Sequence, residues 1–243
     1  MTCHFVRWTS TETLPDLQRL PDELIASTQG FSAKRRERYL KSRALLAEMM
    51  CYFLGYPQLP ALLASADGRP YFADPNLPNF SLGYAGNTIA ILMSEEGDVG
   101  MDIEIVNINT SPHTPTPTAA EKAWIEAQLD PLEAATQLGT IRQSLMKIPR
   151  SNGCRAESLK LHPASGRLRS DCFPAVEVMS DIDDYLAWAC AHVPALNRLV
   201  MWTYATESGM KKTGEIGRQQ RPPPRYMKLT SHSAEKAASA ISQ

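Results

Sequence analysis

The chain has 243 residues, 43% of them hydrophobic and 21% charged, and its formal net charge is −1. This length can form one large domain or two small ones, and so small a net charge favours neither nucleic acid nor a membrane surface as a partner. No apolar run approaches the ~20 residues of a membrane span, and the N-terminus lacks the apolar stretch of a signal peptide. Five scattered cysteines without a C-x-x-C pair argue against a zinc site or a disulfide framework. We therefore expect a cytoplasmic globular protein.

The first predicted elements are a short strand at residues 4–9 and a long helix at residues 33–54. The helix begins after Ser32, carries apolar side chains at a spacing of three and four residues, and ends at Gly55. The first part of the chain therefore combines a strand with a helix that has one apolar face.

Short strands follow this helix. One begins at residues 79–81, and we expect it to break at glycines 83 and 86. The apolar run at residues 87–94 is the next strand. The sequence E-E-G-D after it is a hairpin turn signal that returns the chain into a further strand at residues 98–106.

The composition changes after residue 106. Three prolines and no apolar residue in N-T-S-P-H-T-P-T-P-T indicate a linker. A helix is predicted at residues 119–129, and a second begins with Asp130 as N-cap and Pro131 at the first helical position. Four apolar segments between residues 158 and 204 are then expected to form a second sheet, and the polar chain from residue 205 a disordered tail.

Helices and antiparallel hairpins occur here without a strict strand–helix–strand alternation, which favours an α+β fold. Each half of the chain could hold one helix against one small sheet. The predicted domains are an N-terminal half at 1–106, a linker at 107–118, a C-terminal half at 119–204 and the tail at 205–243.

Two carboxylates lie one residue apart in the strand D-V-G-M-D-I-E-I-V. The apolar residues of this strand alternate onto one face, so Asp102 and Glu104 share the other face. Side chains two residues apart lie roughly 6–7 Å from one another, and both could reach one Mg²⁺ ion, whose ligands are oxygen atoms. The alternative is a solvated strand face with no ligand.

The predicted long helix carries six cations. Arg36 and Arg43 are two turns apart and share one stripe, and guanidinium groups bind phosphate through paired hydrogen bonds. A solvated helix face with Glu37 as counter-ion is the alternative. The six cations are Lys34, Arg35, Arg36, Arg38, Lys41 and Arg43.

Two further segments carry chemistry of the same kind. The glycines in G-Y-A-G-N at residues 83–87 would let backbone N–H groups approach a phosphate, although a plain turn would explain them equally. In T-I-R-Q-S-L-M-K, Gln143 and Lys147 are one helical turn apart, with Arg142 beside them. An ordinary amphipathic helix is the alternative for this second segment.

The order and spacing of these segments resemble the 4′-phosphopantetheinyl transferase superfamily in its larger, monomeric form. V-G-M-D-I-E resembles the V-G-x-D-[IV]-E signature, and R-R-E-R-Y-L-K-S-R-A-L-L-A-E-M resembles the Arg-rich first helix. G-R-P-Y-F, F-S-L-G-Y-A-G and T-I-R-Q-S-L-M-K resemble the G-K-P, N-x-S-H-S-G and W-x-x-K-E-[AS]-x-x-K motifs. The resemblance spans residues 35–147 and looks like that of a divergent bacterial branch.

The resemblance implies two similar α+β halves in a pseudo-twofold arrangement, with coenzyme A bound in the cleft between them. It also implies a cytoplasmic, Mg²⁺-dependent transferase of the holo-[acyl-carrier-protein] synthase type. Such an enzyme moves 4′-phosphopantetheine from coenzyme A to a serine of an acyl or peptidyl carrier protein and releases 3′,5′-ADP.

Carried over by position, the resemblance implies three sets of residues. The Mg²⁺ ligands would be Asp102, Glu104 and Gln143. The catalytic residues would be Glu121, as a base or water-mediated ligand, together with Arg142 and Lys147, which neutralise the pyrophosphate. Coenzyme A would be bound by Arg36, Arg43, Arg69, Gly83, Tyr84, Ala85 and Gly86.

The chain departs from the family pattern at three positions. Gln143 stands where the helix motif has glutamate, and a neutral amide oxygen binds Mg²⁺ more weakly than a carboxylate. Tyr84 replaces the histidine of the S-H-S-G segment, and Gly139 replaces the tryptophan of the helix motif. These departures leave open a second function, that of a relative which binds coenzyme A or a carrier protein without turnover.

Overall fold

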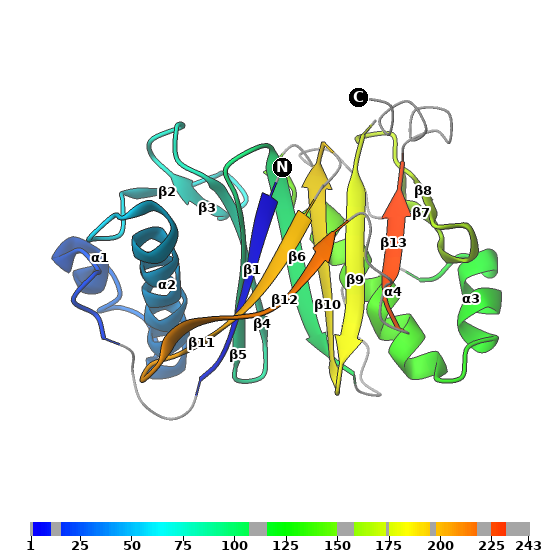
Figure 1. Ribbon diagram of the computed structural model, residues 1–243, viewed down its shortest axis with the longest axis horizontal. Coiled ribbons are helices and arrows are strands. Elements are labelled where there is room, and N and C mark those ends of the chain that lie inside the picture. Colours follow the sequence, from blue (N-terminus) through cyan, green and yellow to red (C-terminus); the bar gives the residue numbers. More distant parts are fainter. Residues whose placement is uncertain are drawn as a thin grey trace.

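The computed structural model describes residues 2–10, 16–106, 116–149, 158–173, 175–194, 198–217 and 225–231. The protein has the expected α+β fold, built from two main sheets that pack face to face (Figure 1). Helix α2 (Ala33–Leu54) covers the outer face of one sheet, and helix α4 (Pro131–Met146) covers the outer face of the other. The described chain therefore forms four layers, with one apolar core under each helix and a third between the sheets.

Helices α2 and α4 begin where local sequence signals predict, whereas the helix predicted at residues 119–129 ends at Glu126. Gly55 adopts the left-handed conformation, with φ of 75°, that ends α2. The Asp130 side chain accepts hydrogen bonds from the N–H groups of Leu132 and Glu133, both at 3.0 Å, and so caps α4. Two shorter helices, α1 (Asp22–Ala26) and α3 (Ala119–Glu126), complete the described set.

The first sheet has five strands in the order β12–β11–β1–β5–β4. Strand β1 pairs in parallel with β11 and antiparallel with β5, so it lies at the centre of the sheet. The bounds are β1 (Thr2–Thr9), β4 (Asn79–Ala85), β5 (Thr88–Ser94), β11 (Arg198–Ala205) and β12 (Gly209–Gly217).

The second sheet has six strands in the order β6–β10–β9–β13–β8–β7, and β2 and β3 form a separate two-stranded ribbon. The bounds are β6 (Asp98–Ile105), β7 (Lys160–His162), β8 (Arg167–Arg169), β9 (Glu177–Asp183), β10 (Leu186–Val193) and β13 (Met227–Thr230). Those of the ribbon are β2 (Leu62–Ala64) and β3 (Pro70–Phe72).

The two halves of the chain exchange strands, which corrects two predictions. Strand β11 was expected in the second sheet but pairs with β1 in the first. The expected hairpin between β5 and β6 does not form, since β6 pairs with β10 instead. The reason is that β5 already has β1 on one edge and β4 on the other, so it offers β6 no free edge.

Two further expectations are wrong. Strand β4 continues through Gly83, because the missing side chain leaves room for Met101 of β6. The segment predicted as a disordered tail contains β12 and β13, each paired with a neighbouring strand along its length. The sequence does not predict these two strands, because their apolar periodicity is weak. Their pairing depends on free strand edges that are distant in sequence.

Three observations concern the cysteines, membrane-spanning segments and the linker. Cys3, Cys51 and Cys190 are free thiols, whereas Cys172 is disulfide-bonded, which its spacing did not predict. None of the helices in the described ranges has the length and apolar character needed to cross a membrane. Most of the predicted linker, residues 107–115, lies outside the described residues.

Candidate active site

Strand β6 presents its two carboxylates on one face, as its alternation predicts. Met101 and Ile103 lie in the core between the two sheets. Asp102 and Glu104 lie on the opposite face, which α4 covers. Their partners on the neighbouring strand β10 are Ala189 and Ala187, both small residues.

Gly100 lets α4 approach this face closely. A Cβ atom at Gly100 would lie 2.0 Å from the carbonyl oxygen of Ser144 and 2.8 Å from the backbone nitrogen of Ile148. No side chain fits there, so the last turn of α4 rests directly on the backbone of β6. This contact positions Lys147, the C-cap residue of α4, over Asp102.

Lys147 joins the two sheets at this point. Its Nζ donates to Asp102 Oδ1 at 2.7 Å and to the carbonyl oxygen of Leu82, on β4 of the other sheet, at 3.1 Å. Asp102 is only 6% exposed, and burial raises the pKa of its carboxyl although Lys147 opposes this effect. The second oxygen, Oδ2, is buried without a hydrogen-bond partner. A buried carboxylate oxygen with no donor is costly unless it has a ligand.

Glu104 lies two residues further along β6, on the same face as Asp102. Partial burial and the negative charge of Asp102 both raise the pKa of Glu104. Within the described ranges, no group of three or more His, Cys, Asp or Glu side chains is arranged so that it could hold a metal ion. Two carboxylates, with Gln143 one turn from Lys147 on α4, fit an Mg²⁺ ion that keeps water or phosphate oxygens as its remaining ligands.

Glu121 and Arg142 form a separate buried ion pair. An Nη atom of Arg142 donates to Glu121 Oε1, and the side chains are 5% and 1% exposed. The N–H groups of Thr118 and Leu161 donate to the Glu121 carboxylate as well, at 2.8 and 3.2 Å. Burial raises the pKa of Glu121, but these donors outweigh burial and hold it below the ordinary value. Arg142 and Lys147 point about 140° apart around α4, because each residue turns the helix by 100°.

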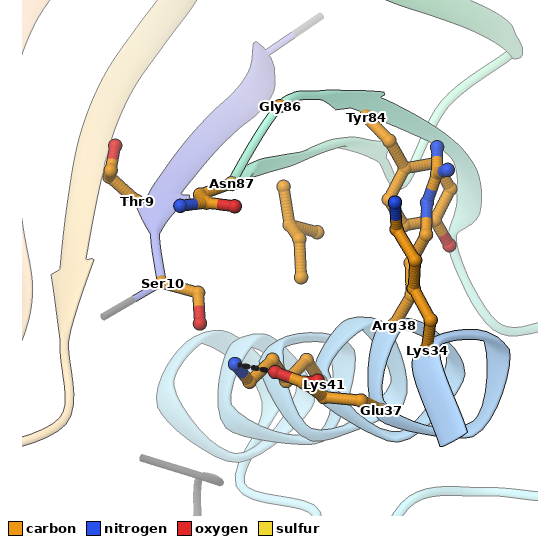
Figure 2. Close-up of a pocket in the computed structure, with 10 residues that line it drawn as sticks. Thr9, Ser10, Lys34, Glu37, Arg38, Lys41, Tyr84, Gly86 and Asn87 are labelled. Atoms are coloured by element: carbon orange, nitrogen blue, oxygen red, sulfur yellow. Dashed lines mark hydrogen bonds and ion pairs between the residues drawn. The ribbon is translucent and has the colours of Figure 1, made fainter. Parts of the chain in front are cut away.

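A cleft of about 830 Å³ opens between α2 and the turn that joins β4 to β5 (Figure 2). Lys34, Arg38 and Lys41 line it at a spacing of four and then three residues, which is one stripe of the helix. The Arg38 guanidinium lies 3.9 Å from the centre of the Tyr84 ring, and Lys41 Nζ lies 2.5 Å from Glu37 Oε1. The cleft is lined by Thr9, Ser10, Lys34, Glu37, Arg38, Lys41, Tyr84, Gly86, Asn87 and Ile89.

The three arginines expected to hold phosphates do not line this cleft. Arg36 donates to Thr28 Oγ1 at 3.1 Å. Arg43 is buried over the Tyr39 ring, with the guanidinium carbon 4.3 Å from the ring centre. Arg69 lines another cleft, of about 520 Å³. The sequence places Lys34, Arg38 and Lys41 among the six cations of this helix, but the phosphate assignment was given to Arg36 and Arg43 instead.

The segment at residues 83–86 divides between the cleft and the core. Tyr84 and Gly86 line the cleft. Gly83 faces β6, where an added Cβ would lie 2.9 Å from Met101 Sδ, and Ala85 is buried in the core between the sheets. Tyr84 is two residues from Leu82, whose carbonyl binds Lys147, so one strand connects the cationic cleft to the paired carboxylates.

Comparison with known proteins gives two levels of similarity, and no family model matches the chain. The uncharacterized protein YieE of Escherichia coli strain K12 is 35% identical over 98% of this chain and 99% of its own length. The 4′-phosphopantetheinyl transferase AcpT of the same strain is 42% identical over 79 residues, which are 32% of this chain and 37% of AcpT. AcpT of Salmonella typhi is 38% identical over 88 residues, 36% of this chain and 42% of that protein. The chain therefore belongs to the family of YieE, and part of it is related to the 4′-phosphopantetheinyl transferases.

Proposed function

We propose that this protein transfers 4′-phosphopantetheine from coenzyme A to a serine of an acyl or peptidyl carrier protein, with Mg²⁺ as cofactor. The observation that carries the proposal is the buried, unpartnered Oδ2 of Asp102, a residue that shares a strand face with Glu104 and binds Lys147 through its other oxygen. The partial similarity to AcpT supports the same reaction class.

The cationic cleft suits the nucleotide part of coenzyme A. Lys34 and Arg38 provide positive charge for its phosphate groups. The charge of Lys41 is balanced by Glu37, and one face of the Tyr84 ring carries Arg38. Tyr84 of the cleft and Leu82, whose carbonyl accepts from Lys147, both lie on β4, so a ligand held by the nucleotide could direct its pyrophosphate toward Lys147 and Asp102.

The chemistry requires charge neutralisation more than covalent catalysis. The serine oxygen attacks the phosphorus atom that carries the pantetheine arm, the bond from that phosphorus to the oxygen shared with 3′,5′-ADP breaks, and the serine proton leaves to a base. Mg²⁺ held by Asp102 and Glu104, with Gln143 as a neutral third ligand, would neutralise charge on the pyrophosphate. Lys147 keeps Asp102 in place and adds a positive charge at the same point.

A second function, binding of coenzyme A or a carrier protein without turnover, is favoured by one observation. Lys147 already neutralises Asp102, and Gln143 brings no negative charge, so the net attraction for a divalent cation is weaker than three carboxylates would give. Turnover would add the mass of 4′-phosphopantetheine to a carrier protein, whereas binding alone would leave its mass unchanged.

The test is conversion of a panel of apo carrier proteins to their holo forms, followed by mass spectrometry with and without Mg²⁺. We expect conversion that depends on Mg²⁺, and Asp102→Ala should lower its rate by at least about 100-fold, the effect of removing one preorganised electrostatic group. Glu126→Ala, which removes an exposed carboxylate from α3, is the matched control and should keep the wild-type rate.

Three outcomes decide between the proposals. Full activity of Asp102→Ala, with an unchanged melting temperature, would show that the metal assignment is wrong. Coenzyme A binding by calorimetry without conversion of any carrier protein would favour the second function. Absence of both binding and conversion would refute both.

A further inference from the structure

The hairpin of β7 and β8 carries a cationic face at the edge of the second sheet. In its register, Lys160 lies opposite Arg169 and His162 lies opposite Arg167. Residues directly opposite one another on antiparallel strands share a face of the sheet. The intervening pair, Leu161 and Leu168, is buried in the core under α4. Four basic side chains therefore project together on the side away from that core.

This face carries unbalanced positive charge among the described residues. Neither Lys160, Arg167 nor Arg169 forms an ion pair with any carboxylate in the described ranges. Like charges directly opposite one another destabilise an antiparallel pair. The cations that face one another on the hairpin thus repel each other, and an anion bound between the two strands would reduce this repulsion.

A cavity of about 390 Å³ lies at these side chains. Its lining residues are His162, Ser165, Arg167, Leu168, Arg169 and Ser231. Two guanidinium groups can each present a fork of N–H donors to one oxyanion. Three strands, β10, β9 and β13, separate the hairpin of β7 and β8 from β6, so the cavity is distinct from the paired carboxylates.

We propose that this cavity is a second ligand site, one that binds a phosphate group through Arg167 and Arg169. Cations without described carboxylate partners are the evidence for an anionic ligand. The planar forks of arginine favour a tetrahedral oxyanion over a halide. The phosphate could be free, or it could be carried on a small organic molecule, since the cavity is larger than an inorganic phosphate. The site does not depend on the proposed transferase activity.

The first experiment follows the Nε–H resonances of the two arginines by NMR in the full-length protein. Inorganic phosphate and glycerol phosphate are titrated separately, against sodium chloride at equal ionic strength. Both resonances should move with phosphate and stay in place with chloride. Tighter binding of glycerol phosphate would assign the site to organic phosphomonoesters, and equal affinity would assign it to free phosphate. If neither anion moves them, the site does not exist.

The second experiment uses the sign of a change in melting temperature. Arg167→Gln/Arg169→Gln removes the repulsion, so it should melt higher than the wild type in chloride and should bind phosphate at least about tenfold more weakly at this site. Lys211→Gln, at an exposed lysine of β12 outside the cavity, is the control and should change neither quantity.

A purely protective role for these charges would give the opposite pattern. Charged side chains on an edge strand can also prevent pairing with another chain. In that case the double variant would aggregate, phosphate would not change the melting temperature of the wild type relative to chloride, and the proposal would be overturned.

Discussion

At the scale of single residues, the same chemical group is put to opposite uses in this protein. Glu121 receives hydrogen bonds from Arg142 and from two backbone N–H groups, so its ionised form is stabilised. Asp102 has one ammonium partner and one oxygen without a partner, so burial destabilises its ionised form. Carboxylates whose surroundings shift their pKa values in opposite directions usually differ in role. We therefore expect Glu121 to act through structure and Asp102 to be available to a ligand.

The pair of Glu121 and Arg142 gives a prediction about stability and pH. Glu121→Gln should lower the free energy of unfolding by about 3 kcal/mol near pH 7, because it leaves a buried guanidinium without its counter-ion. The pKa of Glu121 is lowered from its ordinary value of 4.5. Its contribution is therefore complete above pH 4.5 and is lost as the pH falls through the lowered pKa. Urea unfolding of both proteins across this range measures the difference.

The control for this prediction is Glu126→Gln, an exposed carboxylate on the same helix, which should cost under about 0.5 kcal/mol. Transfer activity separates the two roles considered for Glu121. If Glu121 only holds α3 and α4 together, the folded variant should keep activity within about tenfold. A loss near 100-fold without loss of stability would instead show that Glu121 acts as the base.

At the scale of secondary-structure elements, the contact between α4 and β6 positions the site. The Pro131–Met146 helix has its N-terminus set by Asp130, but its distance from the sheet is set by Gly100. Lys147, the C-cap residue that follows the last turn of α4, donates a hydrogen bond to Asp102. A small displacement of this turn therefore separates Lys147 from both Asp102 and Leu82.

Gly100→Ala tests the importance of this contact. The added methyl group cannot avoid the Ser144 carbonyl, so we expect a loss of about 1–3 kcal/mol, as for overpacked cores. The loss of transfer activity should be larger than the loss of folded protein alone would cause, because Lys147 moves away from Asp102. Gly30→Ala, at a glycine with open space around its Cα atom, should change neither quantity. Wild-type melting and activity for Gly100→Ala would show that α4 adjusts freely.

At the scale of the whole molecule, the two halves of the chain are interlocked. Strand β11, near the C-terminus, pairs with β1 at the N-terminus, and β6 of the first half pairs with β10 of the second. The core between the sheets also draws on both halves, through Phe5 and Trp188, whose ring centres lie 5.2 Å apart. The halves predicted from composition are thus not independent folding units.

A fragment of residues 1–106 should consequently fail to fold alone. It would expose the edge of β1 that binds β11, leave β6 unpaired, and uncover one face of the central core. Circular dichroism and amide hydrogen exchange should show no cooperative transition, whereas co-expression with residues 107–243 should restore one. A cooperative melt of the fragment alone would contradict this account.

Much of this protein was determined by the sequence alone. Gly55 and Asp130 set the ends of their helices through contacts within a few residues, and alternation along β6 placed Asp102 and Glu104 on one face. Periods and caps are local, so they can be recognised without knowledge of the fold.

The tertiary structure decided the rest. Strand partners depend on which edges remain free, and that is settled between segments far apart in the sequence. The apolar stripe of α2 sets the rotation of the helix, which turns Lys34 and Arg38 toward the cleft and leaves Arg43 buried. Of the three donors around Glu121, Thr118 belongs to its own helix cap, but Arg142 and Leu161 come from distant segments and reach Glu121 only once those segments have packed together.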